Sequence, residues 1–419
     1  MNFPNIAKNR LLVIFAAALT LRLGFLLFLP PAPPVADATD YDTIAVNLVS
    51  GHGFSINPDV PTPKRAPGLP FLLALVYSVF GHSYAAAAVL QALLGALTCA
   101  AAYRTAERLF GERAAALAGW LLALYPVLIV YTGLLLSETL FTFLLTAAMM
   151  FWVYGVGRRN RWDFVLAGFF LGLATLTRPV TLIFPVVLLF SSVIFNRGLA
   201  ARWLIFLLTF LFVLAPWSAR NYRLWGTLKP CSVGTGYGFF VTGNMAAGLS
   251  FDESFRKYLD KLNAHPEPRT FVPGAPAAAM VLEGELQTEG NALLKANPAA
   301  FMKIALRRLP PFWFTSHSSV FGVDRSLGEY LREKNFLPVA VRLGLLGLQA
   351  ALLALAAAGI WFRRKNWRET APLIALPVFF TGHVLFDFVP RYHLPVMPCI
   401  LIFAAAGLAD LIGRRGKTA

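Results

Sequence analysis

The sequence predicts an all-α polytopic membrane protein, and three observations support this. The 419 residues are 57% hydrophobic and 14% charged, and the mean hydropathy of +0.62 is well above that of soluble domains. The apolar residues form runs of about twenty, the length that crosses a bilayer as a helix. Lysines and arginines gather in short clusters between these runs, as the positive-inside rule expects. No nucleic-acid-binding motif accompanies the net charge of +16, so we expect a lipid bilayer and not nucleic acid as a partner.

The first apolar run extends from Leu11 to Leu29 and follows Lys8 and Arg10. As a helix it is about 28 Å long, enough to cross the hydrocarbon. It is too long for the apolar region of a secretory signal, and no small-residue cleavage site follows it, so we interpret it as an uncleaved span. The basic residues before it predict a cytoplasmic N-terminus.

The segment 30–83 is therefore expected outside the cytoplasm. Its apolar stretch Pro67–Phe80 is short, and a crossing there would put the next basic cluster, at residues 104–113, on the wrong side of the membrane. We predict a helix that lies at the outer interface.

Nine further apolar runs alternate with basic clusters that all fall on one side. This predicts about ten spans, both termini in the cytoplasm, and a location in the cell inner (plasma) membrane. The expected spans are Tyr84–Tyr103, Ala114–Tyr131, Glu138–Val156, Asp163–Thr177, Val180–Phe195, Trp203–Pro216, Leu337–Phe362, Ala371–Phe386 and Leu394–Ile412. The basic clusters are Arg104/Arg108/Arg113, Arg158/Arg159/Arg161, Arg197/Arg202, Arg363/Arg364/Lys365/Arg368 and Arg414/Arg415/Lys417.

One long polar segment, 217–336, interrupts the spans and is predicted to be extracytoplasmic. It is too long for a connector, so we expect a small subdomain packed on the membrane bundle. Its composition predicts a glycine-rich loop at 234–238, a helix over 277–296 and an amphipathic piece over 301–314. The chain is thus divided into a transmembrane module 1–216, the segment 217–336 and C-terminal helices 337–419.

No metal or cofactor is expected. The three cysteines, Cys99, Cys231 and Cys399, are far apart and form neither a disulfide framework nor a zinc motif. The six histidines have no metal-ligand spacing, and the sequence contains no phosphate-binding loop or dinucleotide fingerprint. The absence of an internal repeat argues against many secondary-transporter folds.

Charged residues directly after the first span indicate a functional site. Charge at the end of a membrane span is costly unless it is paired, solvated or needed for function. Asp37, Asp40 and Tyr41 lie there, and Arg65 follows in the same outer segment. A positioned carboxylate can serve as a general base. The alternative is that the two aspartates cap a helix that begins near Tyr41.

Several short motifs, in their order and spacing, resemble the bacterial branch of family 39 glycosyltransferases. These enzymes have the GT-C fold and are related to protein O-mannosyltransferases, to the aminoarabinose transferases of lipid A and to the galacturonosyl transferases of lipopolysaccharide. The resemblance covers nearly the whole chain. The motifs are Asp37-x-x-x-Tyr41, Gly51-His52-Gly53-Phe54, Arg65-x-Pro67-Gly68-x-Pro70, Leu136-Ser137-Glu138, Thr177-Arg178-Pro179, Pro216-Trp217-x-x-Arg220-Asn221-Tyr222, Gly243-Asn244 and Arg391-Tyr392-His393-Leu394-Pro395.

The resemblance implies roles for the charged residues. The family's catalytic aspartate lies four residues before the tyrosine, which here is Asp37, so Asp40 would cap or bind. Arg65 matches the residue that contacts the donor phosphate, and Arg220 and Arg391 are expected to converge on the same group, because arginine binds phosphate oxygens bidentately. The alternative for these arginines is contact with lipid headgroups.

A second acid of the family lies near Glu138, where it would orient the acceptor; the alternative is a favourable interaction with the helix dipole. The remaining candidates are for substrate binding. Tyr41, Arg178 and Tyr392 flank the charged motifs, Asn244 is expected in a loop, and His393 is the histidine expected nearest to the site, with a plain interfacial position as its alternative.

The function expected from this resemblance is transfer of a sugar from a polyprenyl-phosphate donor to a hydroxyl of a glycolipid, glycan or protein at the extracytoplasmic face. Asp37 would act as base in a single, inverting displacement. A lipid-linked glycan transporter or flippase, a ligase that moves a whole glycan, and a non-catalytic assembly partner are the alternatives. Transport predicts charges deep within spans, and Arg22 is the main one here.

Overall fold

A computed structural model describes residues 3–31, 33–195, 200–228, 232–266, 270, 277–386 and 389–415. The described chain is mainly helical, with no strand and one isolated bridge between Ser55 and Pro61. Cys231, Arg197 and Lys417, which entered the sequence predictions, lie outside the described residues. The α-helices are α1 (Phe3–Phe28), α2 (Asp37–Val49), α3 (Gly68–Phe80), α4 (Tyr84–Phe110), α5 (Glu112–Leu124), α6 (Pro126–Val130), α7 (Glu138–Arg158), α8 (Arg161–Thr177), α9 (Phe184–Phe195), α10 (Ala200–Trp225), α11 (Thr235–Ala246), α12 (Phe251–Ala264), α13 (Ala278–Ala296), α14 (Pro298–Trp313), α15 (Leu327–Arg332), α16 (Phe336–Phe362), α17 (Trp367–Thr381) and α18 (Met397–Arg415).

Within the described chain, six helical segments are long and apolar enough to cross a membrane, and a seventh is formed if α5 and α6, bent by 55°, count as one span. The protein is therefore a multi-pass membrane protein. Each predicted span falls on helix, but α8 has only 17 residues and the apolar helices at 179–190 and 369–385 are also short. The total of ten spans remains a prediction.

The segment 217–336 differs from its predicted structure at residues 234–238, where a glycine-rich loop was expected. Gly236 and Gly238 belong to α11, so the predicted glycine-rich loop is wrong. The cause is Glu283 of α13, whose carboxylate accepts from the amides of Gly234 and Gly236 at 3.0 Å and from the Thr235 hydroxyl at 2.5 Å. This carboxylate satisfies the exposed amides at the start of α11 and so allows the helix to begin there. The predicted helix over 277–296 and the amphipathic piece are confirmed as α13 and α14.

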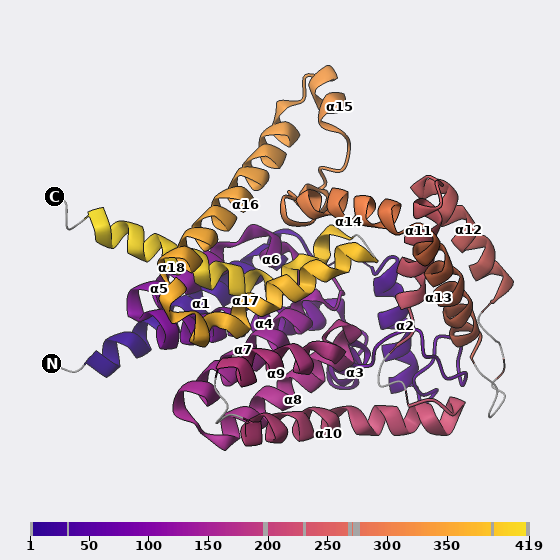
Figure 1. The fold of residues 1–419 in the computed structure, drawn as a ribbon, viewed down its shortest axis with the longest axis horizontal. Coiled ribbons are helices and arrows are strands. Elements are labelled where there is room, and N and C mark those ends of the chain that lie inside the picture. The colour runs from indigo at the N-terminus through magenta and orange to yellow at the C-terminus, as the bar shows by residue number, and fades with distance from the viewer. Residues whose placement is uncertain are drawn as a thin grey trace.

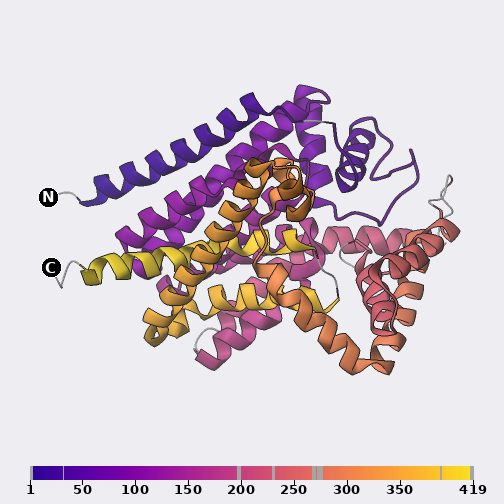
Figure 2. The same ribbon diagram turned by 90° about the horizontal axis from the view of Figure 1, so that it is seen from above.

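The two termini lie at one end of the molecule, and helices α11, α12 and α13 lie at the other (Figures 1 and 2). Helix α2 stands at that same end, between the long helices and the α11–α13 unit (Figure 1). The long helices therefore separate the outer segments from the chain ends.

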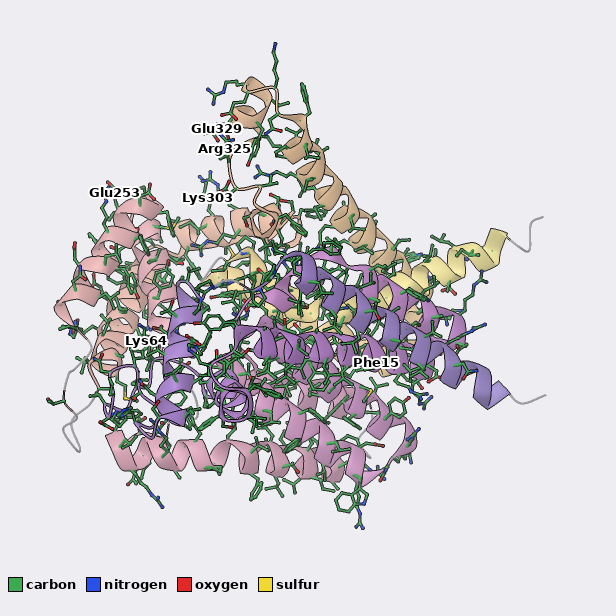
Figure 3. The ribbon with its side chains drawn as sticks, turned by 180° about the vertical axis from the view of Figure 1, so that it is seen from behind. Phe15, Lys64, Glu253, Lys303, Arg325 and Glu329 are labelled. Atoms are coloured by element: carbon green, nitrogen blue, oxygen red, sulfur yellow. The ribbon has the colours of Figure 1, made fainter. Side chains whose placement is uncertain are left out.

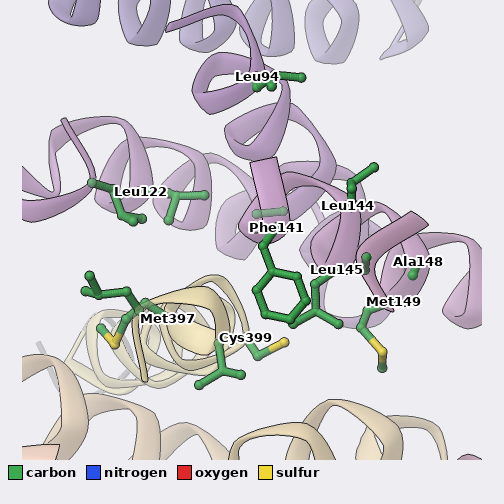
Figure 4. Packing of buried hydrophobic residues seen from close by; sticks show 14 of the residues in the cluster. Leu94, Leu122, Phe141, Leu144, Leu145, Ala148, Met149, Met397 and Cys399 are labelled. Carbon is green, nitrogen blue, oxygen red and sulfur yellow. The ribbon is translucent and has the colours of Figure 1, made fainter. Parts of the chain in front are cut away.

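The core of the long helices is built from close-packed side chains of α4, α5, α7, α8 and α18. Phe141, Leu145 and Met149 of α7 face Cys399 of α18, and all four are buried (Figure 4). Glycines allow some helices to approach more closely: Gly359 of α16 and Gly407 of α18 have their backbones in contact. In lipid, where apolar burial gives little drive, such packing holds helices together. The core gives the outer ends of α7, α8 and α18 fixed positions.

Candidate functional site

Helix α2 begins at Asp37, four residues before the predicted start near Tyr41. Its N-cap is Ala36 at φ 52°, and no side chain caps the helix. The capping interpretation of the two aspartates is therefore wrong. Asp37 and Asp40 lie in the first turn, where carboxylates also interact favourably with the helix dipole.

The loop after α2 folds back along the helix. Gly51 and Gly53 have positive φ values of 85° and 70°, which glycine adopts without strain. The Asn47 amide then donates to the carbonyls of Ser55 at 2.9 Å and Ile56 at 3.0 Å. These bonds return residues 55–66 toward the start of α2.

Close packing after the loop brings α3 to the end of α8. The backbone of Gly68 lies against Thr177, with no room for a β-carbon. Gly68 follows Arg65 by three residues, and Thr177 directly precedes Arg178. Two arginines that are distant in sequence are thereby placed in the same region.

Arg65 joins the two aspartates of α2. Its Nη2 lies 2.8 Å from Asp37 Oδ1, and its Nε donates to Asp40 Oδ2 at 2.8 Å. Lys64 Nζ lies 3.3 Å from the same Asp40 oxygen, beside α2 (Figure 3). This cation was not among the predicted site residues. A basic pair in a segment expected outside the cytoplasm is an exception to the positive-inside rule, and that exception is the signal that would have found Lys64.

Arg391 connects Asp37 to a third carboxylate from the other end of the chain. Its Nη2 donates to Asp37 Oδ2 at 2.7 Å, although the two residues are 354 positions apart. Its Nε lies 3.3 Å from Glu138 Oε1, which also accepts from Arg178 Nη2 at 3.1 Å. We call the resulting group the charged cluster. It comprises Lys64, Asp40, Arg65, Asp37, Arg391, Glu138 and Arg178, that is four cations and three carboxylates, with a net charge of +1.

Burial and charge act in opposite directions on Asp37. Partial burial raises the pKa of this carboxyl, but the neighbouring Arg65 and Arg391 outweigh it and hold the pKa below its usual value of 3.8. Burial likewise disfavours the Arg65 cation, yet Tyr41 and the two aspartates raise its pKa. Both groups are therefore charged at neutral pH.

The three carboxylates differ in access to solvent. The Asp37 side chain is 40% exposed, Asp40 is 18% exposed and Glu138 is 1% exposed. Glu138 Oε2 has no hydrogen-bond partner within the described chain. Asp37 is thus the carboxylate that a molecule from solution reaches most easily, whereas Glu138 is buried and pairs with two arginines.

Two predicted tyrosines line the charged cluster. The Arg65 guanidinium lies 5.4 Å from the centre of the Tyr41 ring, and Arg178 lies 5.2 Å from that of Tyr392. These cation–π contacts fix the orientation of both arginines.

Arg220 lies apart from the carboxylates. Its guanidinium stands 4.3 Å from the centre of the Trp217 ring and donates to Asn221 Oδ1 at 3.0 Å and to the Phe54 carbonyl at 3.5 Å. An aromatic cage therefore holds this arginine, and in the structure it does not converge with Arg65 and Arg391 on Asp37.

Asn244 lies in helix α11 and not in a loop, so that expectation is corrected. It is 2% exposed, donates to the Phe240 carbonyl at 3.0 Å and accepts from Lys257 at 3.4 Å. The short Gly243–Asn244 pattern did not reveal the helix that Glu283 starts.

His393 lies two residues beyond Arg391 but faces away from the charged cluster. It is fully buried, its Nε2 lies 3.4 Å from His317 Nε2, and its ring packs on Phe312 and Trp313. The expectation of an interfacial position is therefore wrong, and the residue belongs to the packing behind Arg391.

A second group of polar residues anchors α2 from another side. Asp42 is 8% exposed and accepts from Tyr77 at 2.6 Å and Tyr84 at 3.1 Å, and its Oδ1 lies 2.8 Å from His82 Nε2. Sequence analysis did not select these residues, because their spacing follows no motif. They hold α2 to α3 and α4, and so fix the position of Asp37.

Comparisons with known proteins agree with this architecture. Residues 64–219 match the family model of dolichyl-phosphate-mannose-protein mannosyltransferases. This range includes Lys64, Arg65, Glu138 and Arg178 of the charged cluster. No curated protein sequence matches the chain.

Among solved structures, the archaeal oligosaccharyltransferase AglB from Archaeoglobus fulgidus is similar. In complex with an inhibitory peptide and a dolichol-phosphate it superimposes with a TM-score of 0.58 at 15% identity over 97% of this chain and 50% of that chain. Tethered to an acceptor peptide, it gives a TM-score of 0.55 at 14% identity over 98% and 50%. The chain spans about half the length of that protein.

ArnT from Cupriavidus metallidurans in the apo state gives a TM-score of 0.43 at 16% identity, over 97% of this chain and 77% of that chain. The likeness to AglB is one of fold. The chain therefore has the GT-C fold, and its residues 64–219 are similar to the dolichyl-phosphate-mannose-protein mannosyltransferase family.

Proposed function

We propose that the protein is a glycosyltransferase that moves a sugar from a polyprenyl-phosphate donor to an acceptor hydroxyl on the extracytoplasmic side of the membrane. The observation that carries the proposal is Asp37 held between Arg65 and Arg391, at 2.8 and 2.7 Å. This arrangement supports the proposal, because a carboxylate that could act as a base stands beside two cations that could bind a phosphate. The similar AglB was solved with a dolichol-phosphate, which supports a lipid-phosphate donor.

The reaction is a single displacement. Asp37 takes the proton of the acceptor hydroxyl while the hydroxyl oxygen bonds to the anomeric carbon. The bond from that carbon to the phosphate oxygen breaks, and its electron pair leaves with the polyprenyl phosphate. Arg65 and Arg391 neutralise the charge that develops on this phosphate. Attack on the face opposite the leaving group inverts the anomeric configuration.

The ion pairs of Asp37 also link binding of the donor phosphate to removal of the acceptor proton. In the structure both carboxylate oxygens accept from arginines, which lowers the pKa of Asp37 and makes it a weak base. A donor phosphate bound to the same arginines shares their charge, and its own negative charge raises the pKa of Asp37. The base therefore strengthens when the donor binds.

The remaining charged residues support this arrangement. Asp40, which also pairs with Lys64, holds Arg65, and Glu138, which also pairs with Arg178, holds Arg391. We assign Asp40 and Glu138 to positioning of the arginines, and Tyr41, Arg178 and Tyr392 to the walls of the donor site. Arg220 would contact the lipid part of the donor or a headgroup, because it lies in a separate aromatic cage.

The decisive test is replacement of Asp37 by asparagine. Asp37→Asn removes the base but keeps the shape, so sugar transfer from a polyprenyl-phosphate sugar should fall by about 10²–10⁴-fold. Binding of the polyprenyl phosphate itself should be kept or tightened, since a negative charge beside the two arginines is lost. Transfer is measured with radiolabelled donor in membranes, and binding with the purified protein.

Asp40→Asn is the matched control, since it removes a carboxylate from the same turn of α2. It should weaken donor binding more than the rate of transfer. Full activity of Asp37→Asn would refute the assignment, and loss of catalysis confined to Asp40→Asn would move the base to that residue. A donor loaded with a polymer, compared with one loaded with a monosaccharide, separates a whole-glycan ligase from the proposed transferase.

A further inference from the structure

A groove lies between α1 and α5, far from the charged cluster. It has a volume of about 320 Å³, within the range of sites for small molecules. Its apolar walls are Val13 and Ile14 of α1 and Ala116 and Trp120 of α5, and its polar end is formed by Asn9 and Arg10. The groove thus combines an apolar trough with one cationic end.

Small residues of α5 create this groove. Gly119 lies against Ile14, where an added β-carbon would come within 2.9 Å of the isoleucine side chain. The two helices therefore touch at this point. On the other side of the contact, the short side chain of Ala116 leaves a space that the partly exposed Trp120 borders.

The groove belongs to the bilayer leaflet opposite the charged cluster. Helix α1 runs from Phe3 to Phe28, and the chain enters α2 nine residues later at Asp37. From Arg10 to Phe28 the helix rises about 27 Å, close to the thickness of the hydrocarbon layer. Arg10 therefore lies at headgroup depth on the side where the chain ends are (Figure 2), whereas Trp120, eight residues and about 12 Å along α5 from Glu112, borders the groove deeper in the hydrocarbon.

The cationic end can accept an anion. Arg10 Nη1 is 3.5 Å from Glu112 Oε1, a long pair in which the arginine side chain is 53% exposed. Glu112 Oε1 also accepts from the Tyr103 hydroxyl at 2.6 Å, so this acid is held mainly by the tyrosine. A phosphate at the mouth of the groove would meet the exposed Arg10 while an acyl chain lies along Val13, Ile14 and Trp120.

We propose that this groove binds one anionic phospholipid of the leaflet opposite the charged cluster, with its phosphate on Arg10 and one acyl chain between α1 and α5. Basic pockets between transmembrane helices bind such lipids. The lipid would hold α1 against the bundle. Without it, only 17% of the apolar stretch of this helix is buried inside the protein.

The test uses the purified full chain in detergent, titrated with dioleoyl-phosphatidylglycerol or dioleoyl-phosphatidylcholine, with bound lipid counted by native mass spectrometry. We expect one tight site that prefers phosphatidylglycerol. Arg10→Gln should weaken this binding by about fivefold, the contribution of one basic residue near a lipid headgroup. Glu112→Gln removes the opposing charge and should tighten it.

Arg161→Gln is the matched control, because Arg161 is also exposed and stands beside an exposed tryptophan, Trp162, at the same end of the bundle. It should leave the tight site unchanged. Ala116→Leu fills the groove without a change of charge and should remove the site for both lipids. Equal losses in Arg10→Gln and Arg161→Gln, no preference for phosphatidylglycerol, or displacement of the lipid by inorganic phosphate alone would each overturn the proposal.

Discussion

At the scale of single residues, the charge around Asp37 makes its pH dependence testable. Because Arg65 and Arg391 hold the pKa of this carboxyl below 3.8, Asp37 is ionised in the free protein above about pH 4. Protonation of Asp37 should therefore not reduce kcat/KM between pH 7 and about pH 5. Removal of one arginine charge raises the pKa, so Arg391→Gln should move the acid limb of the profile to higher pH.

The measurement is kcat/KM for sugar transfer as a function of pH in the wild type and in Arg391→Gln. The position of the acid limb reports the pKa and is independent of the overall loss of rate. Arg363→Gln serves as control, since Arg363 pairs with Asp410 on the other side of the molecule, at 2.7 and 2.9 Å. An acid limb that stays in place in Arg391→Gln would show that Asp37 does not titrate in the reaction.

Glu138 illustrates why a buried acid is kept at this site. Its side chain is 1% exposed, and its Oε1 contacts Arg178 and Arg391. Removal of one partner of a buried pair is costly, because it leaves uncompensated charge. The acid thus stabilises an arginine pair that the low-dielectric membrane would otherwise oppose.

At the scale of helices, the contact between α16 and α18 depends on glycine. Gly359 has the Phe403 carbonyl where a β-carbon would stand, and it also touches Gly407. Gly359→Leu should therefore push the helices apart and destabilise the protein by roughly 1–3 kcal/mol, as overpacking does. Gly344, on the same helix, has no atom within 4 Å of an added β-carbon, so Gly344→Leu is the control.

The comparison is made by thermal unfolding of the two variants in the same detergent. Gly359→Leu should unfold at a lower temperature than the wild type, and Gly344→Leu at the same or a higher one, because leucine also favours helix more than glycine does. If both variants unfold together, the close approach of α16 and α18 contributes nothing to stability.

Helices could be located from sequence because apolar runs of about twenty residues have few alternatives in a bilayer. The start of α11 could not be located, since it depends on Glu283, which lies about fifty residues further along the chain. The start of α2 was misplaced by four residues for a related reason: Ala36 and not a polar side chain precedes it. Local patterns predict a helix well when its ends are determined locally.

The candidate site shows the same limit. Asp37, Arg65, Glu138 and Arg391 could be selected because the charged motifs that contain them resemble those of family 39 glycosyltransferases. Their pairing could not be deduced, since the Asp37–Arg391 contact joins segments 354 residues apart. Arg220 was grouped with them on position alone, and its aromatic cage depends on tertiary packing with Phe54 and Trp217.

At the scale of the whole molecule, the orientation in the membrane decides which substrates the charged cluster meets. The chain ends lie at the end opposite α11–α13 (Figure 2). The basic clusters at 158–161 and 363–365 belong to the connections between long helices and not to the α11–α13 unit. By the positive-inside rule we expect these clusters to face the cytoplasm, which predicts that the α11–α13 unit and the charged cluster face outward. A sugar on a polyprenyl phosphate would then be used after it has crossed the membrane.

Cysteine labelling in intact cells tests this orientation. Cys99 and Cys399 are buried, so they should not react, and replacement of Cys231 by serine removes the remaining native thiol. In that background, Thr288→Cys on α13 should react with a membrane-impermeant maleimide in intact cells, because Thr288 is exposed on the outer unit. Arg161→Cys, exposed at the start of α8, should react only after permeabilisation. The reverse pattern would place the charged cluster in the cytoplasm, where a nucleotide sugar and not a lipid-linked sugar would be the available donor, and the proposed function would fail with it.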